Sequence, residues 1–287
     1  MKIRFIINPI SGTGKQKGIE KHIHKYIDNY EIFYTKKKGD AAIISKEAAK
    51  KNMYAVIAVG GDGTLNECLK PLLNTNTALG IIPCGSGNGF AYHIGMQKIT
   101  EEAIKQIKNA KIKQVDSGSV NNMPFLNVSG IGFDSHIANL FTSLNKRGFI
   151  NYIRLILKEI WYTPQKYSIS YNNKKRYVKA YMISFANASQ YGNNVKISPS
   201  ANIEDGVLDF VIVKEFPKWK IPLFLLRIAR GNIHLSKHIE IIQCEKMQIE
   251  SENTLIHLDG EPFKTKKPIT INLLKKSLKI LIPNEKK

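Results

Sequence analysis

The sequence predicts an α/β protein in which an N-terminal parallel-sheet α/β domain is followed by a mostly antiparallel β-sandwich domain. Over about the first 115 residues, short apolar runs alternate with helix-forming segments, which is the pattern of a parallel sheet covered by helices. After Asp116 many short strand-like runs follow one another, with turn residues between them. A chain of 287 residues is long enough for two such cores. We expect domains over 1–118 and 119–287, with the last strand a candidate to return to the first domain.

The first domain is expected to alternate strands and helices along its whole length. Short apolar runs predict its strands, and glycine or proline follows the third and fourth of them. Asp40 stands where a side chain can cap the second helix, which is rich in Ala and Lys. The expected strands are 2–8, 31–34, 55–59 and 79–82, and the expected helices are 15–29, 41–51, 64–73 and 101–109.

The second domain is expected to begin with two helices, over 135–144 and 151–161, and to continue as strands. These strands are runs that are apolar or that alternate apolar and polar residues, as in a sandwich. They are expected at 167–171, 177–185, 207–213, 239–243, 247–250, 254–258, 269–273 and 278–282.

The chain is strongly basic, with 43 Lys and Arg residues against 23 Asp and Glu residues and a formal net charge of +20. A field of this sign favours anionic partners, among them nucleic acid, acidic lipid surfaces and phosphorylated small molecules. No recognised nucleic-acid-binding motif is present, so nucleic acid is not an expected partner. A solvated basic surface without a partner is the alternative explanation.

The three cysteines, Cys68, Cys84 and Cys244, are widely separated and odd in number, and no C-x-x-C occurs. They indicate reduced thiols rather than a disulfide framework or a zinc site. The N-terminus lacks the pattern of a signal peptide, and the most apolar long stretch, 221–229, is too short to span a bilayer. We therefore expect a cytoplasmic protein whose membrane contact is peripheral, at the inner membrane surface. The sequence carries no signal for its oligomeric state.

Three glycine-rich turns follow strands of the first domain, at 8–15 (NPISGTGK), 60–67 (GGDGTLNE) and 83–90 (PCGSGNGF). Each lies where the C-terminal end of a strand meets the start of a helix, which is the edge where open α/β sheets bind ligands. Glycine lets backbone N–H groups approach a phosphate, and the following helix N-terminus favours its charge. One such loop alone would be an ordinary tight turn, but three on one edge predict a phosphate site.

Two common phosphate-binding motifs do not fit these loops. A Walker A motif ending at Gly14-Lys15 would need glycine at Pro9 and Ser or Thr at Gln16. A dinucleotide fingerprint would need glycine at Lys17 in the first loop or at Phe90 in the third. The sequence therefore supports neither a P-loop NTPase nor a Rossmann dehydrogenase.

Asp62 lies between the glycines of the second loop. A carboxylate beside a phosphate site is suited to organising Mg²⁺, which takes oxygen ligands and is usually shared with substrate phosphates. The alternative is an aspartate that serves a turn or caps a helix. The phosphate-binding context favours the metal-organising role.

Three motifs together resemble one family. GGDGT at 60–64 resembles the nucleotide-binding signature shared by diacylglycerol kinases, sphingosine kinases, NAD kinases and phosphofructokinases. NPISG at 8–12 resembles the N-P-x-x-G opening of the lipid-kinase branch, and LDGE at 258–261 resembles the D-G-E motif of that branch. Their order and spacing agree over essentially the whole chain. The sequence therefore resembles the diacylglycerol kinase and sphingosine kinase family.

This resemblance implies an ATP-dependent lipid kinase that uses Mg²⁺ and phosphorylates a lipid hydroxyl. It implies that Asp62 organises the Mg²⁺–ATP, that Asp116 is a further functional acid, and that Glu261, with Asp259 beside it, is the general base. The positions that it implies around ATP are Asn8, Pro9, Ile10, Ser11, Gly12, Thr35, Gly61, Asp62, Gly63, Thr64, Leu65, Asn66, Glu67 and Ser86.

The resemblance also implies a structural Mg²⁺ loop at 202–207 (NIEDGV). There the Asp205 side chain and the backbone carbonyls of Asn202 and Val207 would be the ligands. The alternative is an ordinary Asp-Gly turn between strands, without metal.

One position departs from the family pattern. Bacterial diacylglycerol kinases of this family commonly carry Asn-Asp after the third glycine loop, whereas here Asn88 is followed by Gly89. The stretch 85–88 (GSGN) is more similar to the sphingosine kinase version. A sphingoid base or ceramide therefore stands beside diacylglycerol as an expected acceptor.

The chemistry of a lipid kinase would divide among these residues. Phosphoryl transfer to an alcohol requires positioning, charge neutralisation and removal of a proton, and Glu261 would accept that proton. Without the resemblance, Glu261 would be a residue beside a hairpin turn, because Asp259-Gly260 is a turn signal by itself. Lys15 is either an additional cation for the phosphates or ordinary surface charge.

The lipid acceptor would be drawn from a membrane. The segment 214–237 interleaves apolar and basic residues, which suits an interfacial helix on anionic lipid and equally a core helix with a basic outer face. The apolar segments 123–131 and 150–161 either line an acyl-chain cleft or belong to the core.

Two other functions compete with a lipid kinase. An NAD kinase with a soluble acceptor would explain 60–64 but not 8–12 together with 258–261. A non-catalytic nucleotide- and membrane-binding protein, weakened by the absence of an acid at Gly89, is the alternative from a different functional class.

Overall fold

The computed structural model describes residues 1–12, 16, 18–142 and 149–284, and the chain forms two compact units. Unit 1 comprises Met1–Val115 together with the C-terminal residues from Lys276, and unit 2 comprises Asp116–Lys275. Two strands, β5 (Lys111–Val120) and β15 (Ile269–Ile282), contribute residues to both units.

Unit 1 is built on a parallel sheet. Its strands lie in the order β2 (Tyr30–Tyr34), β1 (Ile3–Ile7), β3 (Ala55–Gly60) and β4 (Ala78–Pro83), and Ile280 of β15 pairs with Leu79 of β4. Every residue of β1, β3 and β4 is buried, as expected for strands covered on both faces. The chain leaves β1 toward β2 on one side and later returns to β3 on the other. The sheet therefore has its topological switch point between β1 and β3, where ligands bind in open α/β sheets.

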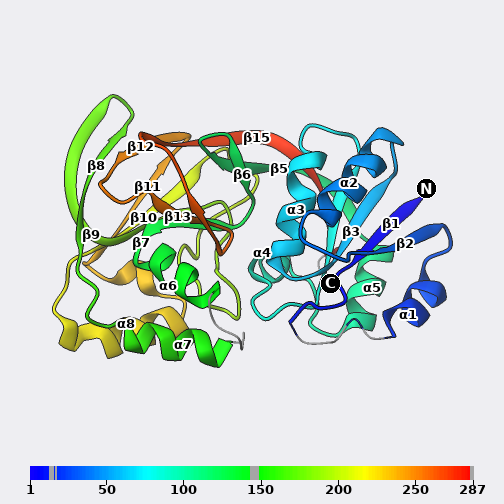
Figure 1. The fold of residues 1–287 in the computed structure, drawn as a ribbon, viewed down its shortest axis with the longest axis horizontal. Coiled ribbons are helices and arrows are strands. Elements are labelled where there is room, and N and C mark those ends of the chain that lie inside the picture. Colours follow the sequence, from blue (N-terminus) through cyan, green and yellow to red (C-terminus); the bar gives the residue numbers. More distant parts are fainter. Residues whose placement is uncertain (13–15, 17, 143–148, 285–287) are drawn as a thin grey trace. The chain divides into compact units, whose positions relative to one another are not determined.

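The helices of unit 1 cover both faces of this sheet (Figure 1). Each buries one apolar face, as Ile19 and Ile23 do in the first helix. The second helix packs on the third, and the first packs on the fifth. They are α1 (Ile19–Tyr26), α2 (Asp40–Lys50), α3 (Asp62–Leu72), α4 (Gly89–His93) and α5 (Thr100–Lys108).

Unit 2 is mostly antiparallel sheet. The strand order is β14-β13-β7-β9-β8-β12-β15, while β10 pairs with both β9 and β11, and β5 pairs with β6 and β15. Aromatic side chains such as Phe125, Phe185 and Phe210 fill the core between the strands. The strands not yet given are β6 (Met123–Phe125), β7 (Val128–Gly132), β8 (Gln165–Tyr171), β9 (Lys174–Ala186), β10 (Leu208–Lys214), β11 (Ile239–Cys244), β12 (Lys246–Glu250), β13 (Leu255–Leu258) and β14 (Glu261–Lys264).

The helices of unit 2, α6 (Phe133–Thr142), α7 (Phe149–Lys158) and α8 (Ile221–Ala229), lie on the same side of that unit (Figure 1). Two short 3-10 turns, η1 (Lys218–Lys220) and η2 (Ile233–Leu235), flank α8. The inner face of α8 packs on a second apolar cluster through Ile221, Phe224 and Ile228. No helix in the described part of the chain is both long enough and apolar enough to cross a membrane.

The α/β fold class, with a parallel-sheet region and a β-rich C-terminal part, is confirmed. Three local expectations were wrong. The segments expected as two strands, 269–273 and 278–282, form the single strand β15, which continues through Lys276 in a left-handed conformation with φ 46°. Helix α3 begins at Asp62 rather than at Thr64. Asp40 is the first residue of α2, and its carboxylate accepts hydrogen bonds from the preceding Lys36 and Lys37 N–H groups instead of capping the helix.

Other elements were not anticipated. Strands β5, β6, β7 and β14 and the short helix α4 carried no expectation, because each is short or is interrupted by polar residues and glycine. The helix expected over 15–29 is α1, and Lys15 and Lys17 lie outside the described residues.

Candidate active site

The three glycine loops of unit 1 pack backbone against backbone at the carboxyl edge of its sheet. A β-carbon on Gly85 would lie 2.5 Å from the Cα atom of Gly61, and one on Gly12 would lie 3.2 Å from the backbone nitrogen of Ser86. Real Cβ atoms essentially never approach backbone as closely as 2.5 Å, so a side chain at Gly85 would push the loops apart. The loops after β1, β3 and β4 therefore form one continuous backbone surface beside the switch point.

Asn8 connects the first of these loops to the second. Its backbone N–H donates to the Val59 carbonyl at 3.0 Å, and its Nδ2 donates to Thr64 Oγ1 at 3.1 Å. Its Oδ1 accepts from the Ile10 N–H at 3.2 Å, and its carbonyl accepts from the Ser11 N–H at 3.3 Å. One side chain thus fixes the turn that follows β1 and attaches it to the first turn of α3.

The remaining residues of the first loop lie around this anchor. The Pro9 carbonyl accepts from Gln16 Nε2 at 2.6 Å, while Ile10 is 89% exposed. Thr35, after β2, donates its N–H to the Ile7 carbonyl at 3.0 Å, which places it beside the start of the loop. Lys15, expected as a cation for the phosphates, lies outside the described residues.

The second loop is the N-terminus of a helix. Gly61 is the N-cap of α3, and its carbonyl accepts from the N–H groups of Thr64 and Leu65 at 3.1 and 3.2 Å. Asp62, Gly63 and Thr64 form the first turn, where helix N–H groups and the positive end of the helix dipole face outward. Leu65 is buried, while Asn66 and Glu67 are partly buried in the next turn. A helix N-terminus of this kind favours an anion.

The third loop is closed by its own asparagine. Asn88 adopts a left-handed conformation with φ 54°, its Oδ1 accepts from the Gly85 N–H at 3.0 Å, and its Nδ2 donates to the Gly85 carbonyl at 2.8 Å. The Cys84 N–H donates to the Gly60 carbonyl at 2.8 Å and joins this loop to the second. Ser86 is exposed at the tip of the loop.

In unit 2, Asp116 lies next to the loop over 202–207. It is buried, its N–H donates to the Ile203 carbonyl at 2.7 Å, and its Oδ2 accepts from the Gly206 N–H at 2.9 Å. Within the loop, Asp205 Oδ1 accepts from the Val207 N–H at 3.2 Å. Asp116 thus holds the segment that contains the expected metal ligands.

The acids around this loop repel one another. Burial, followed by the charges of Asp209 and Asp116, raises the pKa of the Asp205 carboxyl above its ordinary value. A cation beside Asp205 would relieve that repulsion, so these residues fit the expected Mg²⁺ site. The expected ligand set contains one side-chain carboxylate and two backbone carbonyls, from Asn202 and Val207. Among the described residues, no group of three or more His, Cys, Asp or Glu side chains is arranged to hold a metal.

Asp259 and Gly260 form the two-residue turn between β13 and β14, with φ 49° and 87°. Positive φ at both positions is the requirement of the favoured hairpin turn. The Asp259 carboxylate accepts from the N–H groups of Leu126 and Asn127, both at 2.9 Å. Glu261 follows as the first residue of β14, paired with Leu258 and only partly buried. The turn therefore directs the Asp259 carboxylate toward the backbone N–H groups of the neighbouring loop and leaves Glu261 on the edge strand of the sheet.

Asn187 connects the two acidic positions of unit 2. Its Nδ2 lies 3.1 Å from the Asp116 carbonyl and 2.8 Å from the Leu126 carbonyl, and it is fully buried. Since the Leu126 N–H donates to Asp259, the strand of Asp116 and the turn of Asp259 are joined through one asparagine and one loop residue.

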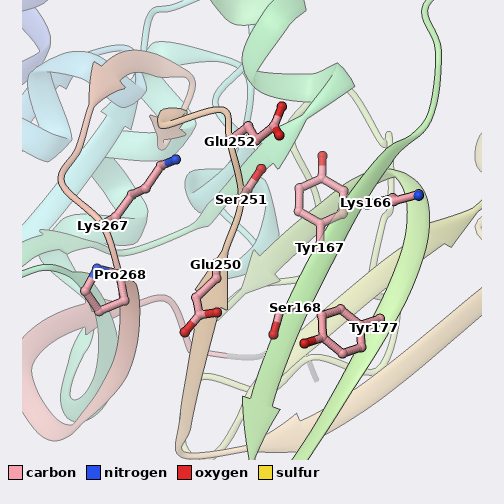
Figure 2. Close-up of a pocket in the computed structure, with 9 residues that line it drawn as sticks. All are labelled: Lys166, Tyr167, Ser168, Tyr177, Glu250, Ser251, Glu252, Lys267 and Pro268. Atoms are coloured by element: carbon pink, nitrogen blue, oxygen red, sulfur yellow. The ribbon is translucent and has the colours of Figure 1, made fainter.

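A pocket of about 630 Å³ opens on unit 2 (Figure 2). It is lined by Lys166, Tyr177, Glu250 and Lys267 among others. Its rim carries both acids and lysines, so its charge favours neither an anion nor a cation. None of the residues expected to hold ATP, Mg²⁺ or the lipid lines it.

Comparison with known proteins identifies the family of the chain. The family model of the diacylglycerol kinase catalytic domain matches residues 2–120, and the model of the YegS C-terminal NAD kinase beta sandwich-like domain matches residues 127–282. A protein of Chromohalobacter salexigens named "Probable lipid kinase YegS-like" is 31% identical over 232 residues, which cover 78% of this chain and 75% of that protein. The chain belongs to this lipid kinase family.

Other members of the lipid kinase family resemble the chain over nearly its full length. A diacylglycerol kinase of Bacillus subtilis is 27% identical over 280 residues, covering 91% of this chain and 89% of that protein. A crystal structure of a diacylglycerol kinase from Bacillus anthracis superposes with a TM-score of 0.79 at 26% identity, covering 99% of this chain and 97% of that one. As a member of this family, the chain is a kinase.

Sequence reasoning on this lipid kinase missed the residues that support the turn of unit 2. Asn187, His257 and Asp134 are all nearly fully buried polar residues that hydrogen-bond across strands. His257 stands two residues before Asp259, and strand alternation there predicts its side chain on the same face as Asp259. Asn187 and Asp134 are distant in sequence from every motif, so only the tertiary structure brings them to it.

Proposed function

We propose that the protein transfers the γ-phosphoryl group of ATP to the hydroxyl group of a membrane lipid, with diacylglycerol as the first candidate acceptor. The observation that carries this proposal is the contact of three glycine loops, backbone to backbone, at the carboxyl edge of the unit 1 sheet. Such a surface suits a triphosphate and lacks the features of a Walker A or a dinucleotide loop. The names of the relatives in Bacillus subtilis and Bacillus anthracis favour diacylglycerol.

ATP is assigned to unit 1. The first turn of α3 would meet the phosphates with its N–H groups, and the loops after β1 and β4 would supply further backbone donors. Asn8 supports this arrangement because it joins two of the loops. The residues that we assign to ATP are Asn8, Pro9, Ile10, Ser11, Gly12, Thr35, Gly61, Asp62, Gly63, Thr64, Leu65, Asn66, Glu67 and Ser86.

Magnesium is proposed at two positions. Mg²⁺ bound with ATP would neutralise charge on the phosphates during transfer, and Asp62, in the first turn of α3, is the residue proposed to hold it. Asp116 is proposed as a second acid of the reaction through its support of the 202–207 loop. The structural Mg²⁺ is assigned to Asn202, Asp205 and Val207, and the negative charges of Asp209 and Asp116 near Asp205 support a cation there.

Glu261 is proposed as the general base. Its carboxylate would accept the proton of the lipid hydroxyl while that oxygen bonds to the γ-phosphorus. The bond from the γ-phosphorus to the β–γ bridging oxygen breaks at the same time, and ADP carries away the electron pair. The products are a phosphorylated lipid, ADP and a protonated Glu261. Asp259 is proposed to position the base, because its carboxylate is held by two backbone N–H groups.

A sphingoid base or ceramide is the second candidate acceptor, and Gly89 is the observation in its favour. Gly89 is the buried first residue of α4, directly after the closed loop that Asn88 forms with Gly85. This position brings no carboxylate to the sheet edge. If phosphoryl transfer to diacylglycerol depends on an acid at this position, the protein would phosphorylate diacylglycerol poorly. The comparison of acceptors described below separates the two candidates.

Peripheral contact with anionic membrane is proposed for a surface on unit 2, which we call the tryptophan surface and define as Trp161, Trp219, Leu223, Leu226 and Lys218. Both tryptophans are about three-quarters exposed, at 76% and 77%. The ammonium of Lys218 lies 4.3 Å from the centre of the Trp161 ring, so the turn that follows α7 and the turn η1 form one surface. Exposed rings and leucines beside lysines suit the boundary of an anionic bilayer.

The inner face of α8 packs on the core, which supports the core-helix explanation of the segment 214–237, and we propose the interfacial explanation for its outer face. The outer face carries Leu223 and Leu226, which are 51% and 43% exposed. We accordingly propose a cytoplasmic protein that acts at the inner membrane surface, where the net charge of +20 favours acidic headgroups.

The proposal is tested by offering ATP labelled on its γ-phosphate, with Mg²⁺, to four acceptors in parallel. Diacylglycerol, a sphingoid base and ceramide are presented in vesicles that contain acidic lipid, and NAD is presented in solution. We expect label on a lipid, with diacylglycerol ahead of the other two. Transfer to NAD alone would contradict the lipid assignment. No transfer to any acceptor, with ATP still bound, would favour a non-catalytic nucleotide-binding protein.

A further inference from the structure

A buried polar cluster in unit 2 has no part in the function proposed above. Its centre is Asp134, in the first turn of α6 and 5% exposed. Its Oδ1 accepts from the Ser135 N–H at 2.8 Å. Its Oδ2 lies 3.1 Å from His257 Nε2, 3.0 Å from the Tyr191 hydroxyl and 3.2 Å from Ser184 Oγ. The carboxylate is therefore held by hydrogen bonds from four different residues and by the N-terminal end of a helix.

The hydrogen bonds of His257 fix the position of its proton. The backbone N–H of Gly260 points at His257 Nδ1 from 3.1 Å, and a backbone N–H can only donate. Nδ1 must therefore accept, which leaves the ring proton on Nε2. That proton is donated to the Asp134 carboxylate at 3.1 Å. A neutral imidazole has one donor and one acceptor, and both are used here.

The bond to Gly260 acts on the turn that carries the proposed base. Asp259 and Gly260 are the two central residues of that turn, and Glu261 is the next residue. The Asp259 carboxylate anchors the turn to the N–H groups of Leu126 and Asn127. His257 anchors the other side of the same turn through Gly260. The position of Glu261 is thus set by two anchors, and only one of them is in the D-G-E motif.

We propose that His257 is a positioning residue for the phosphoryl transfer, held by Asp134 in the tautomer that accepts from Gly260. This inference rests on the proposed function, because it gives His257 its effect through Glu261. A proton on Nδ1 would face the Gly260 N–H, remove the acceptor and release the turn. A buried carboxylate holds a histidine in one tautomer in the same way in serine proteases. A base displaced by about 1 Å can cost roughly 10²-fold in rate.

Two substitutions at His257 separate its two hydrogen bonds. In His257→Asn the amide oxygen can stand where Nδ1 stood and accept from Gly260, while the bond to Asp134 is lost. In His257→Gln the amide reaches Asp134, but no acceptor remains for Gly260. We expect kcat to stay within about 3-fold of the wild type in His257→Asn and to fall roughly 10²-fold in His257→Gln, with KM for ATP unchanged in both.

Asp134→Asn tests the tautomer itself. The amide would donate to His257 Nε2 and force the ring proton onto Nδ1, against Gly260, so kcat should fall as in His257→Gln. The matched control is His136→Gln, on the same helix α6, which replaces a partly exposed histidine whose Nε2 lies 2.9 Å from Glu159. That variant should keep the wild-type kcat, and thermal unfolding of every variant checks that the fold is retained.

The decisive comparison is the double variant His257→Gln/Glu261→Gln. If His257 acts through Glu261, the double variant loses no more kcat than Glu261→Gln alone, whereas independent roles would multiply the two losses. A wild-type kcat in Glu261→Gln overturns the base assignment and with it the proposed function. A large loss in Glu261→Gln with no loss in His257→Gln overturns the positioning role alone.

The tautomer can also be measured directly in the unmodified protein. In ¹⁵N-histidine-labelled protein, His257 should show a proton on Nε2 and none on Nδ1, and its signal is the one missing from the spectrum of His257→Asn. A proton on Nδ1, or on both nitrogens at neutral pH, would overturn the proposal.

Discussion

Asn8 and Thr64, 56 positions apart in the sequence, are joined by a hydrogen bond of 3.1 Å from Nδ2 to Oγ1. Asn8 is the first residue after β1 and Thr64 lies in the first turn of α3, so this bond ties together two loops on either side of the switch point. The same asparagine accepts from the Ile10 N–H and so also sets the turn of its own loop. The arrangement makes Asn8 an organiser of backbone N–H groups in addition to any contact with ATP.

Asn8→Ala should weaken ATP binding. Loss of a partly buried hydrogen bond between loops costs about 1–1.5 kcal/mol, so KM for ATP should rise roughly 10-fold. Thr64→Val removes the same bond from the other side, and the double variant should therefore show less than the product of the two single effects. Thr64→Ser keeps the hydroxyl and serves as the control. Fully multiplicative effects in a double-mutant cycle would contradict the coupling of the loops.

Gly85→Ala should abolish ATP binding and destabilise unit 1. Its β-carbon would lie 2.5 Å from Gly61 Cα, and overpacking of this kind costs about 1–3 kcal/mol. Gly12→Ala places its β-carbon 3.2 Å from the Ser86 nitrogen, so its effect should be smaller. Isothermal titration with ATP and thermal unfolding show which of the two variants loses more ATP affinity and more stability. Wild-type affinity in Gly85→Ala would show that the loops do not need their close contact.

Acid should destabilise unit 1 through Glu31. Burial alone would raise the pKa of its carboxyl, but hydrogen bonds from the guanidinium of Arg4, at 2.7 Å, and from Lys2 outweigh this and hold the pKa below its ordinary value of 4.5. A lowered folded-state pKa gives stability that is present above pH 4.5 and is lost as pH falls through the folded-state value. The Arg4 side chain is fully buried, so Glu31→Gln should cost about 1–3 kcal/mol at pH 7 and flatten the loss in acid.

Chemical denaturation between pH 7 and pH 3.5 measures this effect. Glu102→Gln is the control, because the side chains of the Glu102–Lys105 pair are both exposed and its loss should leave the free energy of unfolding nearly unchanged. Equal pH profiles for wild type and Glu31→Gln would contradict the prediction.

Replacement of both tryptophans of the tryptophan surface should weaken binding to anionic vesicles. Each ring that enters the interface contributes about 1–2 kcal/mol, so Trp161→Ala/Trp219→Ala should bind roughly 10²-fold more weakly in a vesicle sedimentation assay. Lys218→Gln should bind less tightly at low salt and resemble the wild type at high salt. Tyr177→Ala, which removes a 79% exposed ring from the β8–β9 hairpin, is the control. Unchanged binding of the double variant would place the membrane contact elsewhere.

Much of the fold could be predicted because local signals and tertiary structure agree. The buried apolar runs of β1, β3 and β4 and the glycines after them are continuous in sequence, so both the parallel sheet and the loops at its edge followed from pattern alone. Strand β15 differs, because the lysine-rich stretch around Lys276 predicts a turn between two strands. In the structure Lys276 does adopt a positive φ, but the strand continues on both sides of it. The two ends of β15 are held in extended conformation by pairing, with β12 near the first end and with β4 near the second.

The candidate site was predictable only where motifs are contiguous. The loop residues and the Asp259–Glu261 turn carry short sequence signals, and the resemblance gave them roles. Asp134 and Asn187 lie far from every motif in the sequence, so only tertiary hydrogen bonds relate them to this turn, whereas His257 is two residues from Asp259. The backbone role of the Asp259 carboxylate was likewise not readable from sequence, because its partners lie more than 130 positions away.

We propose that Glu261 accepts the proton of a lipid hydroxyl in an ATP-dependent transfer, and a paired measurement on Glu261→Gln is the sharpest check of this role. Transfer of labelled γ-phosphate to diacylglycerol and affinity for Mg²⁺–ATP are measured on the same preparation of wild type and variant. We expect the variant to lose at least roughly 10²-fold in kcat, as on removing a general base, while its affinity for ATP stays within about 2-fold. Lipid phosphorylation at the wild-type rate in Glu261→Gln would contradict it.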